Sequence, residues 1–304
     1  MQAGKPTSPT LASFLMVGSM AIIGVIDNFV ILLADTIGLW QFHLSRAALM
    51  LPLVVGLSLL GLGGMWPKRP GPVVLRSVLI TVALLFYFTA LAILPIAQAL
   101  AGLFTSPIFV LLISALAMRQ PIGPWRIAAV LIGFLGTLCV LQPNPAEFDF
   151  RTLLPVAGGF FYALSAIITR SHCAEESTLA LLTGMILMLA LAGAIGVTLF
   201  TFMPTEGGFA TRGWVWAMQP ALPWIVIQAV GSTAAVFMLI KAYQLGEPSY
   251  VAVFEYSVMI FGPLFAWVAF GQTIGVMQIT GIGLIATAGA VLGWRAGRAE
   301  VAAS

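Results

Sequence analysis

Charge is what this sequence lacks most. Only 8% of its 304 residues are Asp, Glu, Lys or Arg, whereas 61% are hydrophobic, and a soluble domain carries roughly 25% charged residues. Because so small a number of charged residues cannot cover a surface that faces water, we expect lipid to surround most of the chain. The net charge of +3 comes from basic residues near the ends of apolar runs, which argues against a nucleic-acid partner because such proteins carry a basic patch or stripe.

Several chemical signatures are absent as well. The sequence has no G-x-x-x-x-G-K-[ST] motif for ATP, no H-E-x-x-H and no G-x-S-x-G, and no His/Cys/Asp cluster has the spacing of metal ligands. The two cysteines, Cys139 and Cys173, form no CxxC pair, and we interpret both as incidental. We therefore expect a protein that is not an enzyme, that holds no cofactor or metal, and that ATP does not drive directly.

Ten apolar runs dominate what is present. A helix needs about 20 apolar residues to cross a bilayer, and continuous apolarity separates these runs from the alternating strands of a membrane barrel. The first run is too long for the core of a signal peptide and lacks a cleavage site, so we interpret it as the first span. The sequence predicts an all-α integral membrane protein with ten transmembrane helices, over residues 11–34, 40–62, 77–94, 97–118, 125–141, 153–169, 179–203, 222–243, 250–270 and 274–294.

The second five runs echo the first five. Residues 106–109 (Ser-Pro-Ile-Phe) match 262–265 (Gly-Pro-Leu-Phe), and residues 119–123 (Arg-Gln-Pro-Ile-Gly) match 271–275 (Gly-Gln-Thr-Ile-Gly), at nearly one offset. Because five is odd, the second set enters the membrane in the opposite sense to the first. We predict two inverted five-helix repeats in a single transmembrane domain, divided into residues 1–144 and 145–304. This is an architecture of alternating-access transporters, whose substrate site lies near the midplane.

The Lys and Arg residues predict the orientation of the spans. If the N-terminus is cytoplasmic, the inside holds ten of these residues and the outside holds three. The inner ones are Lys5, Lys68, Arg69, Arg76, Arg119, Arg126, Arg170, Lys241, Arg295 and Arg298, and the outer ones are Arg46, Arg151 and Arg212. We therefore predict that both termini are cytoplasmic and that residues 143–152 lie outside.

Polar side chains within the apolar runs are the candidate site residues. An ionisable group at a helix centre costs about 2.5–3.5 kcal/mol on insertion scales and is a functional candidate by default. A tyrosine in mid-span needs a partner for its hydroxyl and often lines a cavity. We predict a substrate site made from Asp27, His43, Arg46, Tyr87, Tyr162, Lys241 and Glu255, with both tyrosines facing one cavity formed by the first, third, fourth, sixth, eighth and ninth helices.

Each candidate also has a structural interpretation. Asp27 lies about 10 Å from the predicted outer end of its helix, where it could bind substrate or a proton, or pair with another helix. His43 and Arg46 share a helix face because they are three residues apart, yet the first could merely pack and the second could reach the headgroups. Lys241 and Glu255 could likewise reach the inner interface, and the two tyrosines could pack between helices.

The order of these features resembles the drug/metabolite transporter superfamily, in its ten-helix EamA-type branch. The resemblance covers nearly the whole chain. It rests on Arg46 early in the second helix, Leu94-Pro95 at the entry to the fourth, residues 106–109 within the fourth, and Gly133 and Gly136 in the fifth. The chain departs from the pattern at Gln120 and Gln272, where such members often carry Glu. The resemblance implies a secondary transporter of the bacterial inner membrane, often an exporter of amino acids or related metabolites, with a central cavity.

We therefore expect export of amino acids, including aromatic or apolar ones, because the candidate groups carry both signs and include aromatic rings. Two alternatives stay open. One is uptake or exchange of a nucleoside- or phosphate-bearing metabolite, which would want more cationic residues in the cavity. The other is an intramembrane enzyme acting on lipids, which would need a clustered acid–base or metal constellation. The expected partners are the small-molecule substrate and the lipid bilayer, with protons as a candidate coupling ion and no nucleic acid, and the chain is expected as a monomer or weak homodimer.

Overall fold

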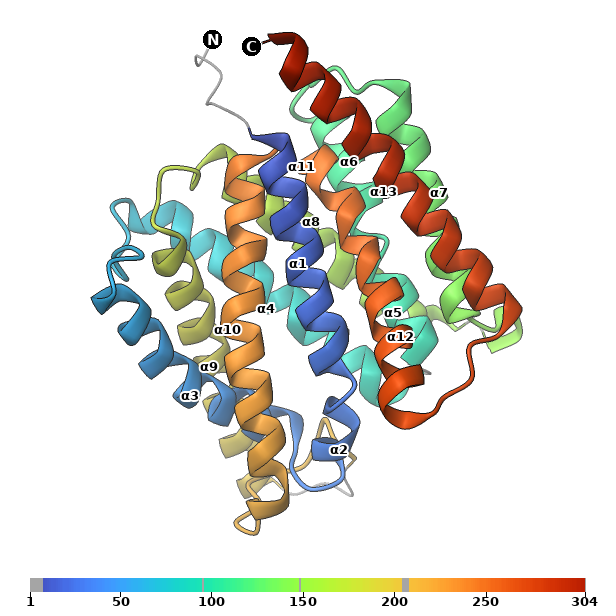
Figure 1. Cartoon of the computed structure of the whole chain (residues 1–304). Coiled ribbons are helices and arrows are strands. Elements are labelled where there is room, and N and C mark those ends of the chain that lie inside the picture. Colours follow the sequence, from blue (N-terminus) through green and yellow to red (C-terminus); the bar gives the residue numbers. More distant parts are fainter. Residues whose placement is uncertain (1–7, 95, 148, 204–207, 304) are drawn as a thin grey trace.

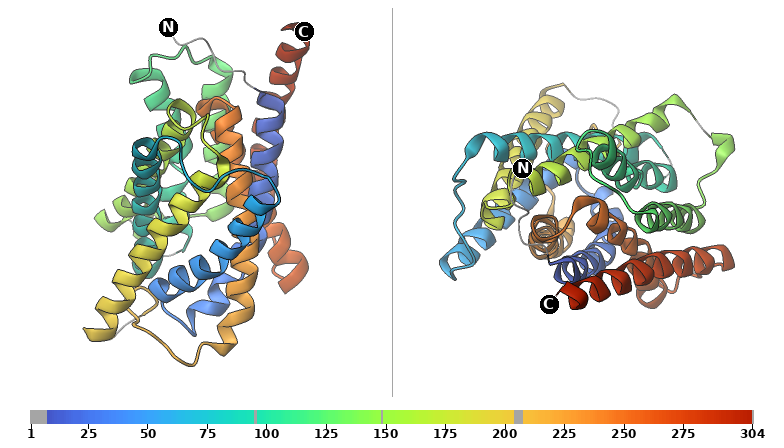
Figure 2. Two further views of the ribbon diagram at one scale, coloured as in Figure 1. Left: turned by 90° about the vertical axis from the view of Figure 1, so that its left-hand side faces the viewer. Right: turned by 90° about the horizontal axis from the view of Figure 1, so that it is seen from above.

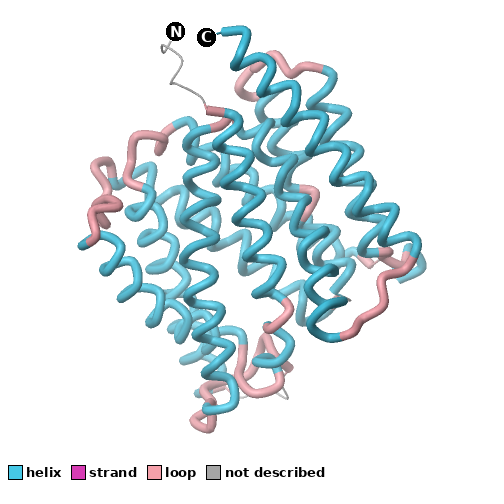
Figure 3. The backbone as a smooth tube through the Cα atoms, in the orientation of Figure 1, coloured by secondary structure: helices cyan, strands magenta, loops and turns pink. Residues whose placement is uncertain are grey.

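A computed structural model describes residues 8–94, 96–147, 149–203 and 208–303 of the protein. Within these residues all regular secondary structure is helical (Figures 1 and 3). Lys5, which contributes to the predicted orientation, and Pro95, which contributes to the family resemblance, lie outside the described residues.

Ten helical stretches in the described part of the chain are long and apolar enough to cross a membrane, which confirms the predicted all-α integral membrane class. In order, the ten spans are built by α1 (Pro9–Asp27), α3 (Leu39–Leu59), α4 (Pro70–Ile93), α5 with α6 (Ile96–Leu103 and Ser106–Leu116), α7 (Pro124–Leu141), α8 (Leu153–Ser171), α9 (Thr178–Phe202), α10 (Leu222–Leu245), α11 with η4 and α12 (Pro248–Val251, Ala252–Ser257 and Val258–Phe270) and α13 (Val276–Ala303). The short elements between spans are α2 (Val30–Ala34) and the 3₁₀ turns η1 (Pro145–Glu147), η2 (Phe150–Thr152) and η3 (Gln219–Ala221).

Three of the predicted spans are broken rather than continuous. The first ends at Asp27, where the Asn28 side chain turns back to the carbonyl of Gly24 (Nδ2···O 2.6 Å), and α2 follows as a separate turn. The fourth breaks at residues 104–105 because Pro107 has no backbone N–H to continue a helix and favours the first turn of a new one. Asp27 therefore ends a helix, which corrects the expectation that it lies two turns inside a continuous span.

The ninth span changes its winding. Between α11 and α12 the six residues of η4 form a 3₁₀ helix, whereas runs of this tighter helix beyond three or four residues are uncommon. The tighter turn rotates the side chains that follow relative to a continuous α-helix, and Glu255 lies within it.

The long helices pack in pairs that join distant parts of the sequence. Helix α7 runs along α13, α4 along α8, α1 along α10 and α3 along α9, with α7 and α13 together at one edge of the bundle (Figures 1 and 2). Suppose that each span corresponds to the span five places later. The α7–α13 pair and the α3–α9 pair then each correspond to themselves, and the α4–α8 pair corresponds to the α1–α10 pair. The division into residues 1–144 and 145–304 stays a prediction.

The two ends of the bundle can be told apart by the chain. Helix α1 begins and α13 ends at one end, which we call the terminal end, and α2 lies at the other, which we call the α2 end (Figure 1). Which end faces the cytoplasm stays a prediction from the Lys and Arg distribution.

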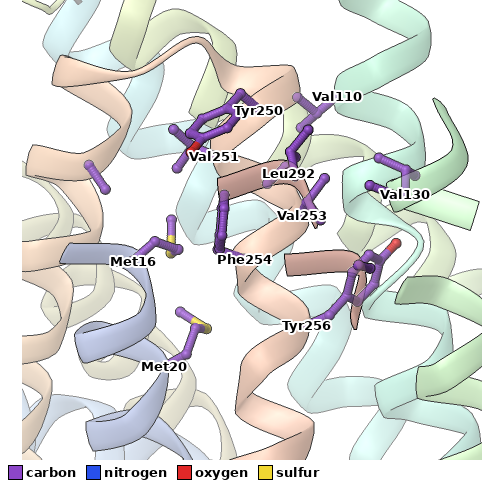
Figure 4. Packing of buried hydrophobic residues seen from close by; sticks show 14 of the residues in the cluster. Met16, Met20, Val110, Val130, Tyr250, Val251, Val253, Phe254, Tyr256 and Leu292 are labelled. Carbon is purple, nitrogen blue, oxygen red and sulfur yellow. The ribbon is translucent and has the colours of Figure 1, made fainter. Parts of the chain in front are cut away.

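The largest buried apolar cluster surrounds η4. Phe254 faces Met16 and Met20 of α1, while Tyr256 lies on the other side of η4 near Val130 of α7 (Figure 4). Large apolar side chains also cover the outside of the bundle, for example Leu59 at 84% exposure and Val276 at 82%. Apolar surface on this scale indicates contact with lipid.

Candidate functional site

The structure divides the predicted site residues between two clusters at different depths. We call Asp27, Arg46 and Tyr87 the α2-side cluster, because Asp27 is the last residue of the helix that leads into α2. We call Glu255 with Tyr162, Tyr243 and Ser106 the buried carboxylate cluster.

Arg46 of the α2-side cluster points into the bundle. Its guanidinium donates to the hydroxyl of Ser232 on α10 (Nη1···Oγ 3.4 Å) and lies 3.3 Å from Nδ1 of His43. It also stacks over the Phe42 ring at 4.8 Å from the centroid. These contacts hold Arg46 between helices α3 and α10, which argues against the alternative of an anchor reaching the headgroups.

His43 supports this arginine from behind. Its side chain is buried and meets the Phe88 ring edge-on, with centroids 4.6 Å apart. The Nε2 atom has no hydrogen-bond partner within the described residues. Because its accessible side is taken by Arg46 and by aromatic rings, His43 is suited to positioning the arginine rather than to touching a substrate.

Asp27 supplies the opposite charge. Its side chain is exposed although Asp27 is the last residue of a membrane helix, and it interacts electrostatically with Arg46 and with the hydroxyl of Tyr87 on α4. Asp27 and Arg46, both within the described residues, make no direct ion pair. Because Asp27 and Arg46 lie near one another without neutralising each other's charge, the two side chains can bind a polar ligand between them.

The backbone beside Asp27 is fixed from two neighbouring helices. Gln228 of α10 donates to the carbonyl of Ile26 (Nε2···O 2.6 Å), and the Asn28 amide also reaches the carbonyl of Gly262 on α12 at 3.4 Å. The end of α1 is therefore held between residues of the second half of the chain.

The buried carboxylate cluster is tighter. The Oε1 atom of Glu255 accepts hydrogen bonds from Tyr243 of α10 at 2.5 Å and from Tyr162 of α8 at 2.8 Å, and Ser106 at the start of α6 also bonds the carboxylate. Glu255 is only 2% exposed, so it does not reach the inner interface as its structural interpretation required. The broken fourth and ninth spans build this site, because Ser106 follows the break between α5 and α6 and Glu255 lies in η4.

A buried arginine stands at the edge of this cluster. Arg76 of α4 is 2% exposed and donates to Thr169 (Nε···Oγ1 3.3 Å) and to the carbonyl of Leu181 (Nη1···O 3.2 Å). It interacts electrostatically with Tyr162. The sequence predicts that Arg76 lies outside the spans, and the structure corrects this by placing it nearly two turns inside α4.

Lys241 and the two predicted tyrosines are placed differently with respect to the two clusters. Lys241 lies two residues before Tyr243 on α10, and residues at that spacing do not share a helix face. Within the described residues it forms no ion pair with Asp27 or Glu255. The two tyrosines have different partners, with Tyr87 beside Asp27 and Tyr162 beside Glu255, and the prediction that both face one cavity stays a prediction. Tyr243 and Ser106 were not in the predicted set, and nothing in their spacing relative to Glu255 points to them.

Contacts between the predicted halves lie at both ends of the bundle. At the terminal end Arg126 pairs with Glu247, and the Glu176 carboxylate accepts from the backbone of Lys68 and Arg69 at 2.8 Å each. At the α2 end Arg212 donates to the backbone carbonyls of residues 34, 35 and 37. Within the described residues no group of three His, Cys, Asp or Glu could hold a metal ion, and the expectation of no metal and no cofactor stays a prediction.

Comparison with known proteins adds relatives of modest similarity. No protein-family model matches the chain. It is 27% identical over 200 residues to a riboflavin transporter of Vibrio cholerae, which covers 65% of this chain and 62% of that protein. It is 23% identical over 236 residues to an S-adenosylmethionine uptake transporter of Rickettsia prowazekii, which covers 78% of this chain and 74% of that protein. This chain therefore matches less than two thirds of the length of the Vibrio relative. None of these names mentions amino acids or export.

The fold itself has a close structural counterpart. A solved crystal structure superposes with a TM-score of 0.78 at 19% identity, over 97% of this chain and 100% of that one. At this identity the likeness concerns the fold alone.

Proposed function

We propose that this protein is a secondary transporter of a bacterial membrane that takes up a small metabolite built on a flat nitrogen heterocycle. The observation that carries the proposal is the α2-side cluster. It holds Asp27 and Arg46 near one another without a direct ion pair, and Tyr87 lies beside them. Two charges that do not satisfy each other inside a membrane bundle are costly, and a polar ligand between them would satisfy both.

The chemistry of the cluster suits a heterocycle. A guanidinium stacks on aromatic faces and donates in a planar fork, a carboxylate accepts from ring or amine N–H groups, and Tyr87 adds an aromatic face. Riboflavin and S-adenosylmethionine, the substrates in the names of the relatives, each contain such a ring system with a hydroxyl-bearing chain or ribose. Uptake of a nucleoside-like metabolite, left open as an alternative by the sequence, therefore replaces amino-acid export as the leading function.

Alternating access is the proposed mechanism. The helix pairs that follow a five-span exchange and the broken fourth and ninth spans support two inverted repeats around a midplane site. The polar contacts at the two ends, such as Arg126 with Glu247 and Arg212 with the α2–α3 segment, would break in turn as each end opens.

The test is counterflow in proteoliposomes. Vesicles preloaded with unlabelled riboflavin, S-adenosylmethionine or a mixture of amino acids are diluted into the labelled compound, and uptake of label is followed. We expect uptake for at least one of the two heterocyclic compounds. If amino acids are transported and neither riboflavin nor S-adenosylmethionine is, the hypothesis of an amino-acid transporter is favoured again. Chemical conversion of lipid without transport would favour the intramembrane enzyme.

Variants then assign the flux to the cluster. Asp27→Asn and Arg46→Gln each remove a charge-assisted hydrogen bond worth about 1.5–3 kcal/mol, so the apparent affinity should fall about 10–150-fold. Asp35→Asn is the matched control, because it changes an exposed carboxylate at the same end of the bundle that lies outside the cluster. If Asp27→Asn and Asp35→Asn behave alike, the substrate does not bind at Asp27.

A further inference from the structure

The proposed substrate site leaves the buried carboxylate cluster unused. We propose that Glu255 is a proton-binding site, separate from the substrate site, that couples uptake to a proton gradient. The inference rests on the proposed transport function and adds the ion that drives it.

The first support is the enclosure of the carboxylate. Glu255 is almost inaccessible to water, and no Lys, Arg or His within the described residues pairs with it. A buried charge without a cation is costly, whereas hydroxyl donors stabilise the ionised form. The tyrosine and serine hydroxyls therefore stabilise the ionised carboxylate less strongly than a paired cation would. Glu255 can then both take up and release a proton.

The second support is where the donors come from. Ser106, Tyr162 and Tyr243 belong to three different spans, and Ser106 lies in the first predicted half while the others lie in the second. A movement of one half against the other changes the number of hydroxyls on the carboxylate. The proton affinity of Glu255 is then different in the two states, which is the requirement for coupling.

The third support is the backbone that carries Glu255. The 3₁₀ winding of η4 is longer than such segments usually are, and stretches of this kind within a span often mark a hinge. Phe254 and Tyr256 on either side of Glu255 pack on α1 and α7 respectively (Figure 4). Both helices belong to the first predicted half, so a change of winding in η4 moves the carboxylate relative to that half.

Other titratable groups near Glu255 do not replace it. The groups that interact with Glu255 are Tyr162 on α8, Tyr243 on α10 and Tyr256 on η4, and Arg76 interacts with Tyr162. The adjoining helices also carry Tyr250 on α11, Lys241 on α10 and Arg126 at the start of α7. Arg126 is occupied by Glu247 at the terminal end. Glu255 is the only carboxylate of this group that is enclosed in the described part of the bundle.

Glu255→Gln imitates the protonated carboxyl and provides the test. Wild-type proteoliposomes should accumulate substrate when the outside is made acidic, by up to about tenfold per pH unit for one proton per substrate. The variant should retain counterflow within about twofold of wild type and should lose all stimulation by the pH gradient. Glu175→Gln, which changes an exposed loop carboxylate, should behave as wild type in both assays.

The outcomes separate this inference from the proposed function. Failure of wild-type counterflow for every compound counts against transport itself. If Glu255→Gln shows normal counterflow and still accumulates substrate in a pH gradient, the proton site is wrong. If a folded Glu255→Gln variant loses counterflow, the proton site is also wrong, because Glu255 would then serve the substrate or the fold.

A measurement without substrate keeps the proton site testable on its own. Infrared difference spectra of the purified protein during a pH titration should show a protonated-carboxyl band that is missing in Glu255→Gln. In Tyr162→Phe the midpoint of that band should move to higher pH, because the anion has lost a donor. If the spectra of wild type and Glu255→Gln are identical, Glu255 does not titrate and the inference is wrong.

Discussion

A single added methyl group at Gly24 should loosen the contact that holds the end of α1. A Cβ atom at this position would lie 2.8 Å from the backbone nitrogen of Gly262 and 3.0 Å from Cβ of Phe261, whereas an ordinary contact is 3.4 Å or more. Neither neighbour is the end of a flexible side chain, so α1 and α12 have to separate by about 0.6 Å. Overpacking of this kind costs about 1–3 kcal/mol, and alanine returns about 0.5–1 kcal/mol because it suits a helix better than glycine.

We therefore expect Gly24→Ala to lower the stability of the protein by up to about 2.5 kcal/mol and to reduce uptake, because Asp27 lies three residues further along. Stability is measured as the folded fraction after heating in detergent, and uptake as the initial rate of counterflow. Gly18→Ala on the same helix is the matched control. Its Cβ would meet only the terminal methyl of Met238 at 2.5 Å, and a methionine side chain can move aside. Equal stability of the two variants would refute the view that a backbone contact at Gly24 positions α1.

Three further predictions follow from other parts of the chain. Tyr87→Ala should weaken substrate affinity by about tenfold or more in a protein that stays folded, as measured by counterflow at several substrate concentrations, and wild-type affinity would remove Tyr87 from the site. Glu176→Gln should destabilise the protein by about 1.5–3 kcal/mol, because its carboxylate accepts two backbone hydrogen bonds, whereas Asp35→Asn, which changes an exposed carboxylate, should change the melting midpoint little. Cysteines introduced at Ala146 and Ala299 should react oppositely with an impermeant thiol reagent on whole cells, and equal labelling would contradict both cytoplasmic termini and the inverted repeats.

The number of spans could be predicted because it depends on composition alone. A run of apolar residues long enough to cross a bilayer has few alternatives in a chain with so little charge. The shared face of His43 and Arg46 could be predicted for a similar reason, since helical spacing fixes which side chains are neighbours, and the structure places their nitrogens 3.3 Å apart.

The breaks within the spans were harder to predict. Pro107 and Pro263 occupy matched positions in the sequence, yet Pro107 begins a new helix and Pro263 lies inside α12. A proline within a span can kink, break or be tolerated, depending on what the neighbouring helices supply to the freed backbone groups. That information comes from packing between helices, so the sequence of one span does not contain it.

The location of Arg76 shows a second limit. In sequence it lies among the basic residues that precede the third apolar run, so an orientation rule counts it as a loop charge. In the structure α4 begins at Pro70, so Arg76 lies within this helix. The guanidinium of Arg76 donates hydrogen bonds to the hydroxyl of Thr169 and to the carbonyl of Leu181. A charge is tolerated inside a span when other spans satisfy it, and the partners come from residues about one hundred positions away.

The same physical cause places the chemistry of both clusters at helix breaks. Where a span is interrupted, backbone groups lose their partners and have to be satisfied by protein or by a water-filled cavity, so polar side chains gather there. Asp27 ends α1, Ser106 begins α6 after an interruption, and Glu255 lies in η4. Continuous helices such as α7 and α13 have no such need within the membrane, and they pack together at the edge of the bundle. In a chain this poor in charge, the interrupted spans are therefore where substrate and ion sites should be sought, and the position of the interruption, more than the identity of any single polar residue, determines which polar side chains meet.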